Sequence, residues 1–229
     1  MKQILAAIVS IGFFVSVCYG ADKVELKDQK DKESYSLGYQ FGMSLKMQGL
    51  DINLDTYTSA IRDALAGKQP QMSSEEIQST IMGIRQRVAD AQQKVMKEQG
   101  EKNQVEGKAF LTENAKKQGV KTLPSGLQYK VVSEGAGKTP KKSDTVTVHY
   151  RGTLINGAEF DSSIARGQPA TFKVDGVIPG WTEALQMMKE GAKWQLFIPA
   201  ELAYGERGAP PRIPPQSVLV FDVELISVQ

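Results

Sequence analysis

The sequence contains few of the side chains that usually serve as nucleophiles, general bases or metal ligands. Among its 229 residues there is one histidine, His149, and one cysteine, Cys18, which lies in an apolar N-terminal segment. A Ser-His-Asp triad, a cysteine nucleophile and a zinc site of cysteine and histidine each need more of these residues. The composition therefore argues against ordinary nucleophilic hydrolysis and against a metal site of this kind.

Aromatic and acidic residues instead recur in five short motifs of the C-terminal half. These are VHYRG at 148–152, GAEFDSS at 157–163, VIPGW at 177–181, AYG at 203–205 and LVFDVEL at 219–225. In order and spacing, over nearly all of residues 125–229, they resemble the FKBP-type peptidyl-prolyl isomerases. With an apolar leader and a charged helical region before them, the whole chain resembles the macrophage infectivity potentiator subgroup of that family.

The resemblance implies an apolar pocket for a proline side chain. Taken singly, each of its aromatic residues would be an ordinary core residue, and only the set as a whole favours a site. The implied floor is Trp181, and Tyr204 and Ile213 would close the rim. The implied walls are Tyr150, Phe160, Phe172, Val177, Ile178 and Phe221.

The resemblance also implies a small number of polar contacts in this pocket. The hydroxyl of Tyr204 and the backbone amide of Ile178 would donate hydrogen bonds to the ligand. Asp161 would lie near the twisted amide, held by Tyr150 and Arg166. Asp161 would then position the substrate and act through its charge, whereas alone it would be a turn residue or a helix cap.

Such a pocket suffices for the implied reaction. Rotation about the bond before proline is slow because amide resonance holds it planar, with a barrier of about 18–20 kcal/mol. The twisted state loses this resonance and the charge separation that water stabilises, so a water-poor pocket favours it over the planar form. Because no covalent bond breaks, we expect no nucleophile, no metal and no cofactor.

Three positions depart from the family members most often described. Ala170 stands where many relatives have an aromatic residue, Ala209 where they have a larger one, and Arg212 where they have an apolar one. We expect a wider and more positive outer rim. Macrolides of the rapamycin type are implied as ligands by the resemblance, but these departures leave their affinity open.

The segments that must position these residues alternate short apolar runs with turn signals. Residues 127–132, 145–150, 194–198 and 218–225 are rich in β-branched and aromatic residues and predict strands. Asn156-Gly157 predicts a two-residue hairpin turn, and residues 181–189 predict one helix ending before Gly191. The predicted class is α+β, with an antiparallel sheet wrapped on one short helix.

The preceding region predicts helices only. Apolar residues spaced three and four apart predict two amphipathic helices over 33–67, and Ser73 with Glu76 predicts a capping box. A long helix should then run to about residue 118, with its first half packed, its second half solvated, and bends or breaks at its glycines. We expect a signal peptide at 1–20, a helical dimerisation region with a long connecting helix at 21–120, and the isomerase domain at 121–229.

The first 20 residues predict a signal peptide. Lys2 precedes an apolar run over 4–17 that is shorter than the roughly 20 residues needed to cross a bilayer, and small Cys18 and Gly20 precede a cleavage point. We expect an exported protein in the periplasm or outer membrane of a Gram-negative bacterium. The alternative is a lipoprotein acylated at Cys18.

Three kinds of function remain open at this stage. The first is an isomerase that assists the folding of exported, proline-containing polypeptides, working as a homodimer joined by its N-terminal helices. The second is a periplasmic holding chaperone that uses the pocket mainly for binding, and the third is a dimeric scaffold with a relict pocket. Nucleic acid is not an expected partner, because 28 basic and 26 acidic residues leave a net charge of only +2.

Overall fold

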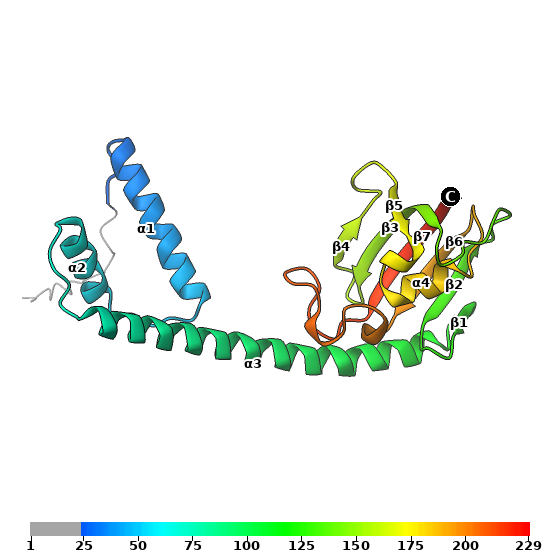
Figure 1. The fold of residues 1–229 in the computed structure, drawn as a ribbon, viewed down its shortest axis with the longest axis horizontal. Helices are drawn as coiled ribbons and strands as arrows, with labels where there is room; N and C mark the ends of the chain where they lie inside the picture. Colours follow the sequence, from blue (N-terminus) through cyan, green and yellow to red (C-terminus); the bar gives the residue numbers. More distant parts are fainter. Residues whose placement is uncertain (1–23) are drawn as a thin grey trace, which may run out of the picture. The chain divides into compact units, whose positions relative to one another are not determined.

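The computed structural model describes residues 24–229, which fall into two compact units separated after Gln71. The first unit is helical, and the second contains a long helix and all seven strands (Figure 1). The predicted signal peptide and Cys18 lie outside the described residues. Among residues 24–229, no helix combines the length and the apolar character needed to cross a membrane.

The first unit contains the two predicted helices, α1 (Gln29–Met47) and α2 (Leu54–Leu65). The side chain of Asp28 caps α1, and that of Asn53 caps α2 by accepting a hydrogen bond from the backbone of Thr56 at 2.9 Å. Neither helix contains a buried residue. Their apolar side chains are therefore available to a partner.

Helix α3 spans Ser74–Asn114 without interruption, and both hydrogen bonds of the predicted capping box are present at its start. Its glycines do not break it. The expectation that its second half is solvated is wrong. Its buried residues are Gly100, Gly107 and Asn114, all in the C-terminal half, where the helix packs against Pro215, Val218 and Gln128 of the same unit.

The sheet of the second unit is antiparallel throughout, in the order β1, β2, β6, β7, β3, β4, with β5 pairing with β3. The proposed domain boundary at 120–121 falls at its first strand. The strands are β1 (Val120–Thr122), β2 (Gln128–Ser133), β3 (Thr145–Leu154), β4 (Glu159–Ser162), β5 (Ala170–Lys173), β6 (Lys193–Ile198) and β7 (Leu219–Val228).

The core lies between one face of this sheet and helix α4 (Pro179–Leu185). Figure 1 shows α4 beside the sheet. Pro179 occupies the first turn, where a missing N–H has no cost, so α4 starts two residues before the predicted helix. It also ends four residues before the predicted end. Trp181, Ala184 and Leu185 point from it into the core, together with Met188 in the turn that follows.

The connection between β3 and β4 is longer than the predicted two-residue turn. It comprises residues 155–158, closed by a hydrogen bond from Leu154 N–H to the Ala158 carbonyl at 2.9 Å. Gly157 has a positive φ of 86°, whereas the Asn156 side chain accepts a hydrogen bond from Ala158 N–H. The asparagine thus stabilises the turn with its side chain and does not adopt a left-handed backbone.

Candidate active site

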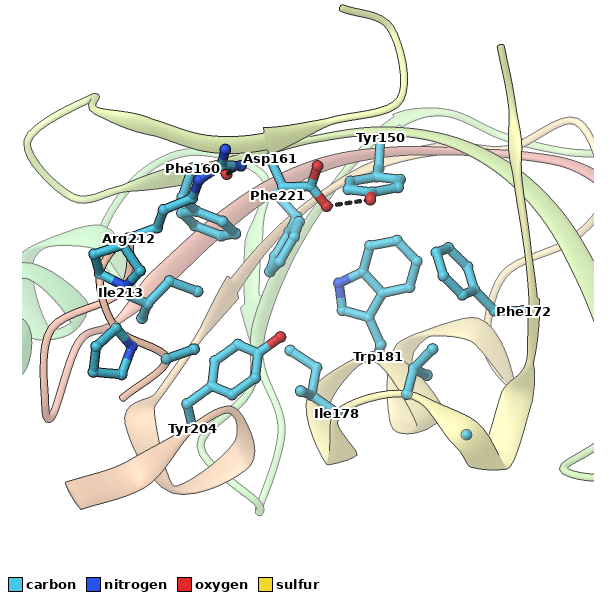
Figure 2. Close-up of a pocket in the computed structure, with 15 residues that line it drawn as sticks. Tyr150, Phe160, Asp161, Phe172, Ile178, Trp181, Tyr204, Arg212, Ile213 and Phe221 are labelled. Carbon is cyan, nitrogen blue, oxygen red and sulfur yellow. Dashed lines mark hydrogen bonds between the residues drawn. The ribbon is translucent and has the colours of Figure 1, made fainter. Parts of the chain in front are cut away.

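A cavity of about 630 Å³ opens between helix α4, the central strands and the loop that precedes β7 (Figure 2). Ten of the eleven predicted site residues line it, and Arg166 lies just behind the lining, bound to Asp161. The complete lining is Tyr150, Phe160, Asp161, Phe172, Gly176, Val177, Ile178, Trp181, Tyr204, Ala209, Pro210, Pro211, Arg212, Ile213 and Phe221.

Trp181 lies at the centre of the aromatic wall and is only 4% exposed. The rings of Tyr150, Phe172 and Phe221 meet it edge to face, with centroids 5.4, 6.0 and 5.3 Å away and interplanar angles of 90°, 83° and 81°. Phe160 meets Phe221 in the same way at 5.5 Å. These contacts are the favoured geometry for aromatic pairs, so the rings fix one another's orientation.

Two glycines allow this arrangement. A Cβ atom on Gly152 of β3 would lie 2.7 Å from ring atoms of both Phe160 and Phe221. A Cβ atom on Gly180 would lie 2.5 Å from Cγ2 of Ile198, so glycine lets α4 approach β6. The close packing of the aromatic wall therefore requires the absence of a side chain at both positions.

One polar cluster interrupts the apolar lining. The carboxylate of Asp161 accepts hydrogen bonds from the Tyr150 hydroxyl and from the Arg166 guanidinium. Arg166 also donates to the Tyr150 hydroxyl at 2.9 Å, and its guanidinium lies over the Tyr150 ring, 5.6 Å from the centroid. The three side chains hold one another in place at one edge of the cavity.

The charge states in this cluster follow from these contacts. Burial acts to raise the pKa of Asp161, but the hydrogen bonds from Tyr150 and Arg166 outweigh it and hold that pKa below its usual value. Burial, and then the hydrogen bond to the carboxylate, raise the pKa of Tyr150. At neutral pH the cluster therefore contains a carboxylate, a neutral phenol and a guanidinium.

Two residues on the side of the cavity opposite this cluster have hydrogen-bond donors without a partner in the described part of the chain. Ile178 precedes the first turn of α4, and none of the hydrogen bonds among residues 24–229 uses its backbone N–H. Tyr204 is 43% exposed, and Figure 2 shows its hydroxyl directed toward the interior of the cavity. Both donors are free to bind a ligand carbonyl.

The rim contains the expected residues Tyr204, Ala209, Arg212 and Ile213, together with residues that the motifs did not assign to the pocket. Pro210 and Pro211 line it, and so does Gly176 on the other side. Arg212 also lines the cavity, and it donates a hydrogen bond to the Phe160 carbonyl at 3.0 Å, which fixes its side chain. Ala170 packs against the core and does not line the cavity, whereas Ala209 and Arg212 do.

The sequence matches two families that follow one another along the chain. Residues 136–226 match the FKBP-type peptidyl-prolyl cis-trans isomerases, and residues 30–131 match the domain amino terminal to FKBP-type peptidyl-prolyl isomerase. The chain is 42% identical to the outer membrane protein MIP of Legionella longbeachae over 229 residues, which is all of this chain and 98% of that one.

The chain belongs to the FKBP-type peptidyl-prolyl isomerase family.

Other members of the FKBP family are similar to this chain over a comparable length. The peptidyl-prolyl cis-trans isomerase Mip of Coxiella burnetii is 43% identical over all of this chain and 99% of its own. The crystal structure of FkpA from Escherichia coli, 45% identical, matches with a TM-score of 0.70 over 90% of this chain and 99% of that one. The predicted family, the α+β fold with its helical N-terminal region, and the prediction of an isomerase assisting the folding of exported proteins are confirmed.

Proposed function

We propose that the cavity binds the prolyl ring of an unfolded polypeptide against Trp181, between Tyr150, Phe160 and Phe221. The observation that carries this proposal is the set of edge-to-face rings around a buried indole at the base of an open cavity. An apolar five-membered ring fits such a wall, and the bond before it lies where water is displaced. The pocket then favours the twisted amide over the planar one.

The polar groups have separate roles in this proposal. The N–H of Ile178 and the hydroxyl of Tyr204 bind substrate carbonyls, because both residues line the cavity and both donors lack a partner among the described residues. Asp161 acts through its negative charge on the twisted amide and does not transfer a proton, because the reaction moves none. Tyr150 and Arg166 hold the carboxylate ionised and fix its direction.

We predict that Asp161→Ala lowers kcat on a prolyl peptide more than Tyr204→Phe does. Asp161→Ala removes the fixed charge and frees Tyr150 and Arg166, for which we expect a loss of about tenfold. Tyr204→Phe removes one neutral hydrogen bond and should raise KM about threefold. Protease-coupled assays of both variants, with the exposed Asp175→Ala as a control, test this. Equal activity of the two variants would contradict the assigned roles.

The N-terminal helices support a homodimer. Leu37 and Phe41 of α1 are 66% and 61% exposed, and Ile77 and Ile81 at the start of α3 are also exposed. Apolar side chains at helical spacing on a soluble chain need a covering surface, and a second copy of the same helices supplies one. Residues 30–131 match the domain that precedes FKBP-type isomerases, which favours a shared arrangement.

The proposed location is the periplasm or the outer membrane. A relative with 42% identity over the whole chain carries the name of an outer membrane protein, and the first 20 residues have the pattern of a signal peptide. The proposed clients are exported chains that contain proline. Macrolides of the rapamycin type would compete for the same aromatic wall.

A holding function is a second candidate, favoured by the exposed methionine and aromatic side chains of α1. Two pockets on one dimer would bind an unfolded chain at two points and raise the apparent affinity. Residues 72–229 retain α3 and the whole sheet, so this fragment can be compared with the mature chain. We expect equal rates on a short prolyl peptide and a slower rate for the fragment on a refolding protein limited by proline isomerisation. Absence of isomerisation in both samples would disprove the enzymatic function.

A further inference from the structure

The loop that forms the rim of the cavity lies against helix α3. We call residues 204–218 the rim loop. Its inner part supplies Tyr204 and residues 209–213 to the cavity lining, and its outer part, residues 215–218, contacts the helix. Figure 1 shows this orange segment beside the green C-terminal half of α3. The same short loop thus touches both the substrate pocket and the long helix.

Asn103 makes the polar part of this contact. Its side-chain amide donates a hydrogen bond to the Pro215 carbonyl at 2.7 Å and lies 3.4 Å from the Ser217 hydroxyl. The side-chain amide of Gln99 donates a hydrogen bond to Oδ1 of Asn103 at 2.8 Å, which fixes the orientation of the Asn103 amide group. The helix therefore binds the backbone carbonyl of Pro215 through an amide group whose orientation is fixed.

Two buried glycines make the close part of the contact. Residues 100, 103 and 107 lie on one face of α3, because they are three and four positions apart. A Cβ atom on Gly107 would lie 2.7 Å from Cγ2 of Val218, and one on Gly100 would lie 3.3 Å from Cβ of Pro215. These glycines, which cost helix stability, are explained by the approach of the loop.

Backbone hydrogen bonds connect this contact to the pocket. The Gln216 N–H donates to the Gly205 carbonyl at 2.8 Å, beside Tyr204. Ala209 and Ile213 exchange two backbone hydrogen bonds of 2.8 and 3.0 Å, which close the part of the loop that lines the cavity. With Arg212 bound to the Phe160 carbonyl, the loop is held by α3 at its base and by β4 at its tip.

We propose that Gly100, Asn103 and Gly107 are positioning residues of the isomerase site. By holding the rim loop, helix α3 sets where Tyr204 and residues 209–213 meet the polypeptide on either side of the proline. The helix therefore determines the preference for the residue that precedes proline. This inference rests on the proposed binding of the prolyl ring in the aromatic cavity.

The test uses Gly107→Ala in the full mature chain, measured on a series of tetrapeptides that differ in the residue before proline. Displacing Val218 and the loop should lower kcat/KM about fivefold for bulky residues at that position and less for alanine. Gly83→Ala is the matched control, because a Cβ atom there would meet only the end of Arg87, at 4.0 Å. Its kcat/KM values should stay within about twofold of wild type.

A second substitution distinguishes loop displacement from general damage. In Gly107→Ala combined with Val218→Ala, the new methyl group meets only a Cβ atom at the 3.7 Å of an ordinary contact. We expect the double variant to recover the wild-type order of preference. Asn103→Asp, which replaces the donor by an acceptor without a change of size, should alter the preference in the same direction as Gly107→Ala.

The proposal is overturned if Gly107→Ala and Asn103→Asp, both folded by circular dichroism, keep the wild-type preference. It is also overturned if the Val218→Ala partner fails to restore it. These outcomes are distinct from failure of the proposed site. If the cavity is not the prolyl site, Phe221→Ala will keep full activity. If only the positioning role is wrong, Phe221→Ala will be inactive and the α3 variants will behave like the wild type.

Discussion

Phe221→Ala is expected to lower kcat/KM for a prolyl peptide by about a hundredfold, the largest loss of any single substitution considered. Phe221 contacts Trp181, Tyr150 and Phe160 through ring edges and faces, and its side chain lines the cavity. Its removal leaves a space that water can enter beside the bond that must rotate, so the preference for the twisted amide is lost. Protease-coupled peptide assays at low temperature measure this effect.

Leu225→Ala is the matched control for this variant. Leu225 lies four residues further along β7, is fully buried in the same core and does not line the cavity. Both substitutions should reduce stability by about 2–5 kcal/mol, which thermal unfolding would show. If both variants lost activity in proportion to their stability, Phe221 would be an ordinary core residue and the role assigned to the aromatic wall would be wrong.

The site could be predicted largely because its residues carry local signals. Tyr150 and Phe221 lie on paired strands whose alternation is visible in the sequence, and Trp181 lies at the start of the helix that covers them. The motif resemblance placed these distant segments around one cavity. What periodicity alone could not give was the mutual orientation of the rings, which depends on packing across the whole core.

Part of the rim, unlike Tyr204, Arg212 and Ile213, escaped prediction for a physical reason. Pro210 and Pro211 lie in a loop without periodicity, and the position of this loop depends on contacts with α3 about a hundred residues earlier in the chain. For the same reason, Gly100 and Gly107 were interpreted as weak points of a solvated helix. A glycine that costs helix stability and one that admits a neighbouring loop look identical until the neighbour is known.

The hairpin between β3 and β4 shows the limit of turn signals. Asn-Gly favours a tight turn when both residues adopt positive φ, but only Gly157 does so here. The side chain of Asn156 binds the Ala158 N–H, and the loop gains two residues. The register still places Asp161 opposite Gly152, where the aromatic rings need space.

Because this register places Gly152 beside the aromatic rings, we expect Gly152→Ala to cause the second largest loss of activity. The added methyl group would lie 2.7 Å from ring atoms of Phe160 and Phe221, both held by further aromatic contacts. Overpacking of this kind costs about 1–3 kcal/mol of stability. Because the two rings must move apart from their edge-to-face contact, we expect a fall in kcat/KM of more than about tenfold, measured on the same peptides.

Gly176→Ala is the control that shows whether the loss in Gly152→Ala comes from displacement of the rings. Gly176 also lines the cavity, but a Cβ atom there would meet only Cβ of Lys173, at an ordinary 3.6 Å. Its kcat/KM should stay within about twofold of wild type, because no ring is displaced. A large loss in Gly176→Ala, or none in Gly152→Ala, would show that catalysis does not depend on the spacing of the two phenylalanine rings. Retained activity with altered ring packing would place the prolyl ring elsewhere in the cavity.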